Sequence, residues 1–524
     1  MQDSITQANW RIARAAIVVM AGMALSSLAG LATTILVSRA FGTSAELDAF
    51  YAANRLPEIL FNLMAGGALA SAFVPTFTGL LTRENQPGAW RLASAVGNTL
   101  FLLLSAAAAL AWAAAPWLVG HLLAPGFRDP GQTAATVQLL RIMLLSPVIF
   151  GVSGLLMGIL NAHQRFLLPA LAPASYRLGW ILGIVFLVPR WGIEGLAWGV
   201  VLGAVLHLLV QLPGLRGLTP HYRPLLGWRE ADVRHVGRLM LPRLLGVAVV
   251  QINFLVNTIL ASAMTEGSLT SLTLAFSLMI VPQAVIAQAT GIAALPTFSA
   301  QVARGALSEM RSTLATTLRG VLFLAMPASL GIILLRRPLV ALALQRGAFT
   351  AESTGMVAWA LLWFGAGLVG HALLEVVVRA FYAMHDTRTP VIVGTVAMGL
   401  NVVLSLWLWG VFVHLGWMPH GALALANSLA TALEAFTLLV LASRRLSGLD
   451  LAQRRRGILA GLGAGAVMAS TLALWIPATR GLSPWASGLG GVALGAGVYA
   501  LSAFALGAPE ARQAAARLAA RLRR

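Results

Sequence analysis

The chain has no cysteine and no lysine, and only 10% of its 524 residues are charged. Without cysteine it forms no disulfide and offers neither a thiolate nucleophile nor a cysteine-based metal site. A soluble globular domain carries about 25% charged residues, so this composition excludes that class. All 36 basic residues are arginine. Because no physical requirement excludes lysine everywhere, we attribute this to genome composition.

Motifs for enzyme chemistry are also missing. His163, His371 and His385 are scattered, with no HExxH motif and no carboxylates at metal-binding spacing. The many glycines lie in apolar segments rather than in a phosphate-binding loop. We therefore expect a protein that is not an enzyme, with no catalytic residue, no metal and no cofactor.

What the chain has instead is a series of long apolar segments, and 58% of its residues are hydrophobic. About fourteen segments of roughly 20 apolar residues or more are long enough to cross a bilayer. The start of the chain lacks the small-residue cleavage site of a secretory signal, so we expect the first span to be retained. The sequence predicts an all-α polytopic membrane protein with spans near residues 14–40, 46–81, 90–121, 133–161, 166–189, 192–212, 235–263, 268–301, 309–335, 353–384, 389–413, 420–442, 456–477 and 484–507.

Short motifs recur with a displacement of 221 residues, which indicates an internal duplication. FVPTFTGLLTR at Phe73–Arg83 returns as LPTFSAQVAR at Leu295–Arg304. With the same displacement, Pro169 in NAHQRFLLP corresponds to Pro390 in YAMHDTRTP. Each copy holds six predicted spans. An even number preserves direction, so the copies form parallel repeats about an axis along the membrane normal.

The duplication sets the expected domain organisation. We expect an N-terminal lobe (1–212), a cytoplasmic linker (213–234), a C-terminal lobe (235–442), two further spans (443–507) and a basic cytoplasmic tail (508–524). With the amino terminus inside, the inner segments hold a large excess of arginine over the outer ones, as the positive-inside rule requires. Both termini are then cytoplasmic, and topology rather than nucleic acid explains the net charge of +19.

Ionisable residues at bilayer depth are functional candidates because burying a charge there is costly. In the span 46–81, Asp48, Arg55 and Asn62 share one helix face. Glu58 lies three residues from Arg55 and can pair with it. Two interpretations follow: the ion pair is structural, or the face lines a cavity between the lobes.

Further candidates lie in the second copy. Arg243 begins an unusually polar segment that includes Asn257, and Glu375 and Arg379 lie one helical turn apart. Arginines near helix ends also extend to the membrane interface, which explains Arg243 equally well. The predicted substrate-binding residues are Asp48, Arg55, Glu58, Asn62, Arg243, Asn257, Glu375 and Arg379.

Five segments of the chain resemble a known family: APGF (124–127), ILNAHQRFLLPALAP (159–173), GVAVVQINFLVNTILAS (246–262), QRGAFTAEST (345–354) and FYAMHDTRTPV (381–391). They are similar to the MurJ/MviN family of lipid II flippases, within the multidrug/oligosaccharidyl-lipid/polysaccharide transporter superfamily. The resemblance implies fourteen helices in two six-helix lobes around a central cavity, with the last two helices forming a groove for a polyprenyl tail. It also implies export of a lipid-linked peptidoglycan precursor across the inner membrane by alternating access. A monomer in the bilayer, with cell-wall synthesis proteins as candidate partners, is expected.

The sequence departs from the family at several basic positions. Cavity arginines of the first helix correspond to Ser27 and Thr33 here, and one in the eighth helix corresponds to Ser277, whereas Asp48 is kept and Arg55 matches a basic position. Arginine is the usual ligand of a pyrophosphate because its planar fork matches the oxygens. The alternatives are therefore export of another amphipathic or lipid-linked solute, or a non-transporting scaffold for envelope assembly. The residues that could replace the missing charge are Arg141, Arg177, Arg243 and Arg379.

Overall fold

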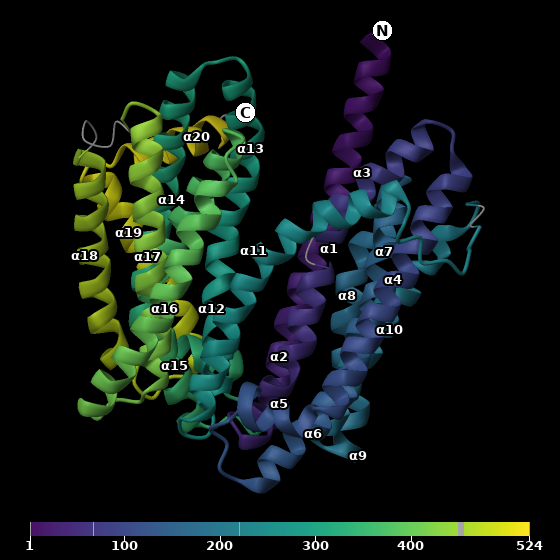
Figure 1. Ribbon diagram of the computed structural model, residues 1–524. Coiled ribbons are helices and arrows are strands. Elements are labelled where there is room, and N and C mark those ends of the chain that lie inside the picture. The colour runs from purple at the N-terminus through teal and green to yellow at the C-terminus, as the bar shows by residue number, and fades with distance from the viewer. Residues whose placement is uncertain (1, 66–67, 219–220, 449–454, 523–524) are drawn as a thin grey trace. The chain divides into compact units, whose positions relative to one another are not determined.

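The computed structural model describes residues 2–65, 68–218, 221–448 and 455–522, and within these ranges every regular element is helical (Figure 1). The chain divides into two compact units, Met1–Glu266 and Gly267–Arg524. The prediction of an all-α protein is confirmed. The described residues of the first unit form α1 (Gln2–Phe41), α2 (Ala45–Ala65), α3 (Ala68–Thr82), α4 (Gln86–Ala113), α5 (Ala115–Leu118), α6 (Pro130–Met143), α7 (Leu145–Ala162), α8 (Leu167–Leu182), α9 (Val188–Trp191), α10 (Ile193–Leu209) and α11 (Ala231–Ser262).

In the first unit, α8 packs against both α1 and α10, and α2 packs against α6, α7 and α11. Small residues allow the closest approaches. A Cβ on Gly179 of α8 would lie 2.1 Å from the Cα of Gly203 in α10, and one on Gly22 of α1 would lie 2.4 Å from the carbonyl oxygen of Ala170. Real side chains never come this close, so these glycines are required for backbones to touch, as in other membrane bundles.

The second unit is organised around α15, which packs against α12, α13, α14 and α17. Its buried residues include Val376 and Phe381, both fully inaccessible. The last two long helices, α18 and α19, pack against each other and against α14. The described helices of this unit are α12 (Ser268–Gln283), α13 (Ala289–Ala303), α14 (Leu307–Leu344), α15 (Ala351–Ala383), α16 (Arg388–His414), α17 (His420–Arg445), α18 (Arg455–Ala478), α19 (Pro484–Ala505) and α20 (Pro509–Leu522).

Twelve helices within the described residues are long and apolar enough to cross a membrane, and a thirteenth is counted if the bent pair Ala231–Leu241 and Gly246–Ser262 of α11 is one span. The expected span 46–81 is described as two helices, α2 and α3, and is not among the twelve. The predicted number of fourteen is therefore approximate.

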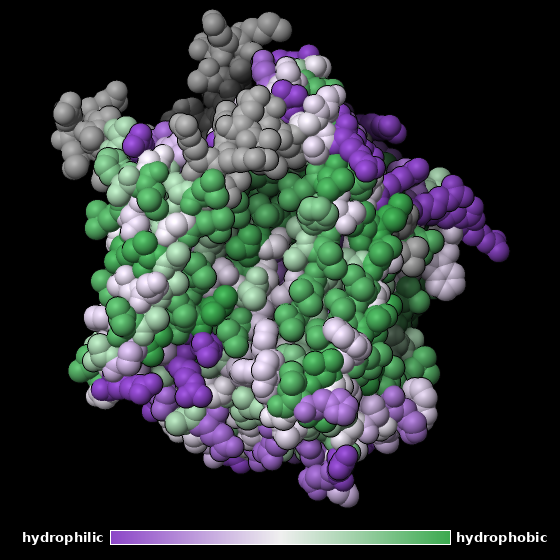
Figure 2. Space-filling model, turned by 90° about the vertical axis from the view of Figure 1, so that its left-hand side faces the viewer, coloured by the Kyte–Doolittle hydropathy of each residue, from purple (hydrophilic) through white to green (hydrophobic). Residues whose placement is uncertain are grey.

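Hydrophobic side chains form a broad band on the face shown in Figure 2, between hydrophilic rims. Helix α18 shows why such a surface belongs in lipid: Leu459, Leu462 and Leu474 are all more than half exposed. Large apolar areas of this kind are costly in water and stable in a bilayer.

Helix boundaries recur with the displacement of 221 residues seen in the sequence. Gln164 and His385, which are related by it, have φ angles of 58° and 59°, a left-handed conformation that is uncommon for residues other than glycine. Phe77 and Phe298 are both fully buried. This agreement supports the duplication. The corresponding boundaries are the ends of α3 at Thr82 and α13 at Ala303, the starts of α4 at Gln86 and α14 at Leu307, the ends of α7 at Ala162 and α15 at Ala383, and the starts of α8 at Leu167 and α16 at Arg388.

Candidate functional site

Helix α2 carries the polar face predicted for the first unit. The helix is continuous from Ala45 to Ala65, so Asp48, Arg55 and Asn62 recur at seven-residue intervals along one side. Asp48 is only 3% exposed, and the other two are partly buried. Whether this face lines a cavity stays a prediction.

The Arg55 guanidinium is held by contacts on two helices. Its Nη1 donates to Glu58 Oε2 at 3.0 Å, which confirms the predicted pair, and its Nε donates to Thr258 Oγ1 of α11 at 3.1 Å. The ring centroid of Phe254 lies 5.5 Å from the guanidinium carbon. The side chain of Arg55 is 12% exposed and that of Glu58 is 44% exposed. Among the described residues Nη2 makes no hydrogen bond, so Arg55 keeps a donor for a ligand.

A second arginine, Arg177 of α8, lies in the same unit. The sequence named it as a possible replacement for the missing charge but not among the predicted substrate-binding residues. Its guanidinium carbon lies 5.7 Å from the ring centroid of Tyr176 and 5.8 Å from that of Trp180. A Cβ on Gly30 of α1 would lie 3.7 Å from its Nε. Arg177 forms neither an ion pair nor a hydrogen bond with any described residue. Its aromatic neighbours in the sequence ASYRLGWIL were the available signal, since arginine stacks on such rings.

Tyr51 of α2 connects these groups. Its hydroxyl lies within electrostatic range of Arg177, Asp48 and Glu58. Arg55 is one helical turn further along α2. Tyr51 therefore has one guanidinium group and two carboxylates within electrostatic range, with Arg55 one helical turn away. Arg177 is the cation among these residues without an acidic partner in the described part of the chain. Such a cluster can bind an anion that competes with Glu58.

Helix α11 belongs to the first compact unit, where it packs against α2 and α3. Asn257, predicted as a site residue, is partly buried next to Thr258, the partner of Arg55. The side chain of Arg243 lies outside those that the structure describes. The predicted assignment of this span to the C-terminal lobe stays a prediction.

The second unit contains the other predicted pair. Glu375 and Arg379 of α15 form an ion pair one turn apart, which is confirmed, and both side chains are about one-fifth exposed. Gly291 of α13 makes room for the arginine, because a Cβ there would lie 2.8 Å from Arg379 Cδ. One turn earlier, His371 Nε2 lies 3.1 Å from Oδ1 of Asn427. The predicted residues thus fall into one set in each unit.

The loop motif YAMHDTRTP has a structural role. Asp386 accepts hydrogen bonds from the backbone N–H groups of Arg388 and Thr389 at 3.0 Å, from the Thr389 hydroxyl, and from Arg445 of α17. The Thr389 hydrogen bonds, assisted by Arg445, lower the pKa of Asp386 to about 2. Asp386 therefore caps the start of α16 and ties it to α17.

No group of three or more histidine or acidic side chains in the described residues could hold a metal ion. Long apolar helices, an apolar surface (Figure 2) and charged residues inside the spans define a multi-pass membrane protein. Residues 37–487 match the family described as Lipid II flippase MurJ. The chain belongs to this family.

Curated relatives support the same assignment. The chain is 34% identical over 432 residues to the lipid II flippase MurJ of Burkholderia cenocepacia, covering 81% of this chain and 82% of that protein. It is 32% identical to a probable lipid II flippase MurJ of Rhizobium meliloti, covering 73% of each chain. The relative from Vibrio cholerae is 30% identical, with 76% and 78% covered.

Solved structures show the fold. A lipid II flippase MurJ in an inward closed conformation has a TM-score of 0.79 and 24% identity, with 93% of this chain and 98% of that chain covered. An inward-facing MATE family multidrug transporter of the MOP superfamily has a TM-score of 0.68 and 17% identity, with 83% and 99% covered. The expected all-α, multi-span fold is confirmed.

Proposed function

We propose that this protein is a flippase that moves a polyprenyl-linked peptidoglycan precursor of the lipid II type from the inner to the outer leaflet by alternating access. The observation that carries the proposal is the family match from residue 37 to 487. The relatives named lipid II flippase align over most of both chains. A transporter of this kind needs no covalent chemistry, in agreement with the expectation that the protein is not an enzyme.

The diphosphate of the precursor binds at the α2 and α8 cluster in this proposal. Arg55 offers its unbonded Nη2, and Arg177 offers a guanidinium without an acidic partner in the described residues. Two cations suit a diphosphate, which carries at least two negative charges. Arg177 then supplies a positive charge in place of the family arginines that the first helix lacks. When substrate binds, its phosphate displaces the Glu58 carboxylate, which is 44% exposed, from Arg55.

Orientation and organisation follow the sequence-based expectations. The excess of arginine in one set of loops supports cytoplasmic termini and an inner-membrane location. A monomer with lobes 1–212 and 235–442 suffices for alternating access. Cell-wall synthesis proteins are candidate partners because they consume the exported precursor.

Complementation tests the proposal. We expect the chain to restore growth in bacteria depleted of their resident lipid II flippase, and the double variant Arg55→Ala/Arg177→Ala to fail at equal expression. The matched control is Arg480→Ala, which removes an exposed arginine outside the cluster. If the well-expressed wild-type chain does not restore growth, one of the two alternatives becomes the better account. These are an exporter of another amphipathic or lipid-linked solute and a non-transporting scaffold for envelope assembly.

A further inference from the structure

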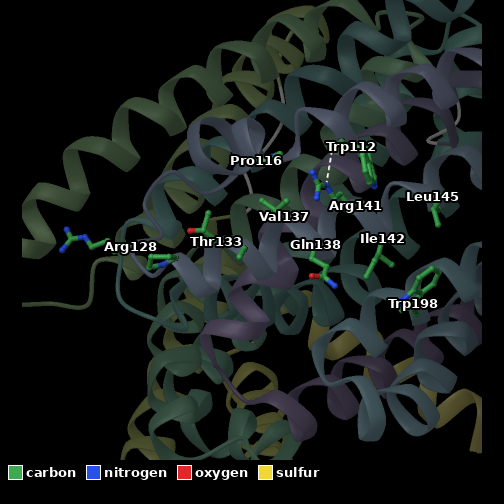
Figure 3. Close-up of a pocket in the computed structure, with 12 residues that line it drawn as sticks. Trp112, Pro116, Arg128, Thr133, Val137, Gln138, Arg141, Ile142, Leu145 and Trp198 are labelled. Atoms are coloured by element: carbon green, nitrogen blue, oxygen red, sulfur yellow. Dashed lines mark hydrogen bonds between the residues drawn. The ribbon is translucent and has the colours of Figure 1, made fainter.

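A cavity of about 950 Å³ lies in the first unit, at the end of α4 and along α6. Figure 3 shows its side chains in a row, with Arg128 at one end, Trp198 at the other and Arg141 near Trp112. It shares no residue with the α2 and α8 cluster. The lining residues are Trp112, Pro116, Arg128, Pro130, Thr133, Ala134, Val137, Gln138, Arg141, Ile142, Leu145 and Trp198.

The charge of this cavity is entirely positive. Arg128 and Arg141 are its ionisable residues, and neither is paired with a carboxylate among the described residues. Arg141 is fixed in place: its guanidinium carbon lies 4.5 Å from the ring centroid of Trp112, and its Nε donates to the Trp112 carbonyl at 3.3 Å. Both Nη groups of Arg141 remain available as donors for a phosphate, which arginine binds well.

Apart from Thr133 and Gln138, the rest of the lining is apolar. Trp112 is 52% exposed and Leu145 is 48% exposed, an arrangement that is stable only against lipid. Trp112 is the penultimate residue of α4, and tryptophan at a span end is typical of the membrane interface. An interfacial groove with a fixed cation and an apolar floor matches a lipid with an anionic headgroup.

Volume separates a lipid from a simple ion. Sites of about 300–1,000 Å³ enclose ligands of drug size, far larger than inorganic phosphate. We propose that this groove binds a bilayer phospholipid, with its headgroup phosphate at Arg141, the Gln138 side chain contacting the headgroup, and an acyl chain along α6. In the proposed topology this lipid belongs to the outer leaflet. The site is independent of the proposed transport function.

Native mass spectrometry of the full chain, released from phosphatidylcholine nanodiscs containing phosphatidylglycerol, tests the proposal. We expect one phosphatidylglycerol to be retained selectively. Arg141→Gln should weaken retention by about tenfold, because a hydrogen bond to a charged group contributes about that factor. Ala134→Trp keeps both charges but fills the groove from an exposed position, and should abolish selective retention. Arg480→Gln, the matched control, should retain the lipid.

Three results would overturn the proposal. Equal retention by wild type and Arg141→Gln shows that this arginine does not bind the headgroup. An equal loss in Arg480→Gln shows that total charge, not this groove, governs retention. Displacement of phosphatidylglycerol by millimolar inorganic phosphate shows a site for free anions instead of a lipid. If Arg141→Gln does not fold, undiminished retention by Ala134→Trp still contradicts the groove.

Discussion

Replacing Arg55 by alanine separates a structural ion pair from a substrate contact. The alanine variant lacks the hydrogen bond from Arg55 to Thr258. This bond contributes about 1.5–3 kcal/mol to stability because its donor is charged. The variant also lacks the ion pair with Glu58. This pair contributes about 1 kcal/mol or less to stability, because the Glu58 side chain is 44% exposed. The expected loss of stability is therefore dominated by Thr258 and is tolerable for a large bundle.

The effect on transport should be larger. If Arg55 contacts a diphosphate in a partly desolvated site, its removal leaves phosphate charge poorly paired and costs about 2–5 kcal/mol. At about 1.4 kcal/mol for each factor of ten, transport under limiting substrate falls roughly 30-fold to several thousand-fold. Arg55→Lys should recover only part of this, because lysine keeps the charge but lacks the planar fork.

The assay measures precursor translocation in membrane vesicles beside the melting temperature of each purified variant. Thr258→Val is the matched control: it removes the same hydrogen bond from the fold but leaves the charge of Arg55. We expect Thr258→Val to lower the melting temperature and keep most transport, whereas Arg55→Ala lowers both. Full transport in Arg55→Ala and also in Arg55→Ala/Glu58→Ala would refute the reasoning, because Arg55 would then be no ligand.

Three further predictions test the fold and the polar face. Gly179→Leu should destabilise the first unit by about 1–3 kcal/mol or more, because no side chain fits between α8 and α10; thermal melting checks this against Gly497→Ala, where a Cβ meets open space. Asp386→Asn should weaken the α16 cap by about 1 kcal/mol. The pKa of Asp386 in the folded protein is about 2, below its ordinary value. The stability that the wild-type Asp386 carboxylate contributes is therefore fully present above about pH 4 and is lost as the pH falls toward 2. Melting temperatures of wild type and variant measured from pH 8 to 3 test this. Asn62→Cys should react with a water-soluble maleimide, whereas Leu474→Cys, 74% exposed on the apolar surface, should not; an unreactive Asn62→Cys would place that face in lipid.

Local sequence patterns predicted most of the fold. Apolar length located the spans because a bilayer imposes it, and the repeated prolines located the duplication. One feature escaped. The sequence could not show that α11 packs against α2, because apolar faces carry little information about their partner.

The site shows the same limit. Arg55 with Glu58 and Glu375 with Arg379 were predictable, since residues three or four apart on a helix are neighbours. The contact of Arg55 with Thr258 joins residues 203 positions apart and has no local signal. Arg177 was recognisable as an intramembrane arginine, but its approach to Gly30 depends on the packing of α8 against α1.

The most direct test of the account is the appearance of precursor at the outer surface. Cells depleted of their resident lipid II flippase and expressing this chain are treated with a membrane-impermeant reagent that labels the headgroup of lipid II. The account predicts labelling close to that of undepleted cells for the wild-type chain, and labelling near the depleted background for Arg55→Ala/Arg177→Ala at equal expression. Background labelling with the well-expressed wild-type chain would contradict the proposal that this protein exports lipid II.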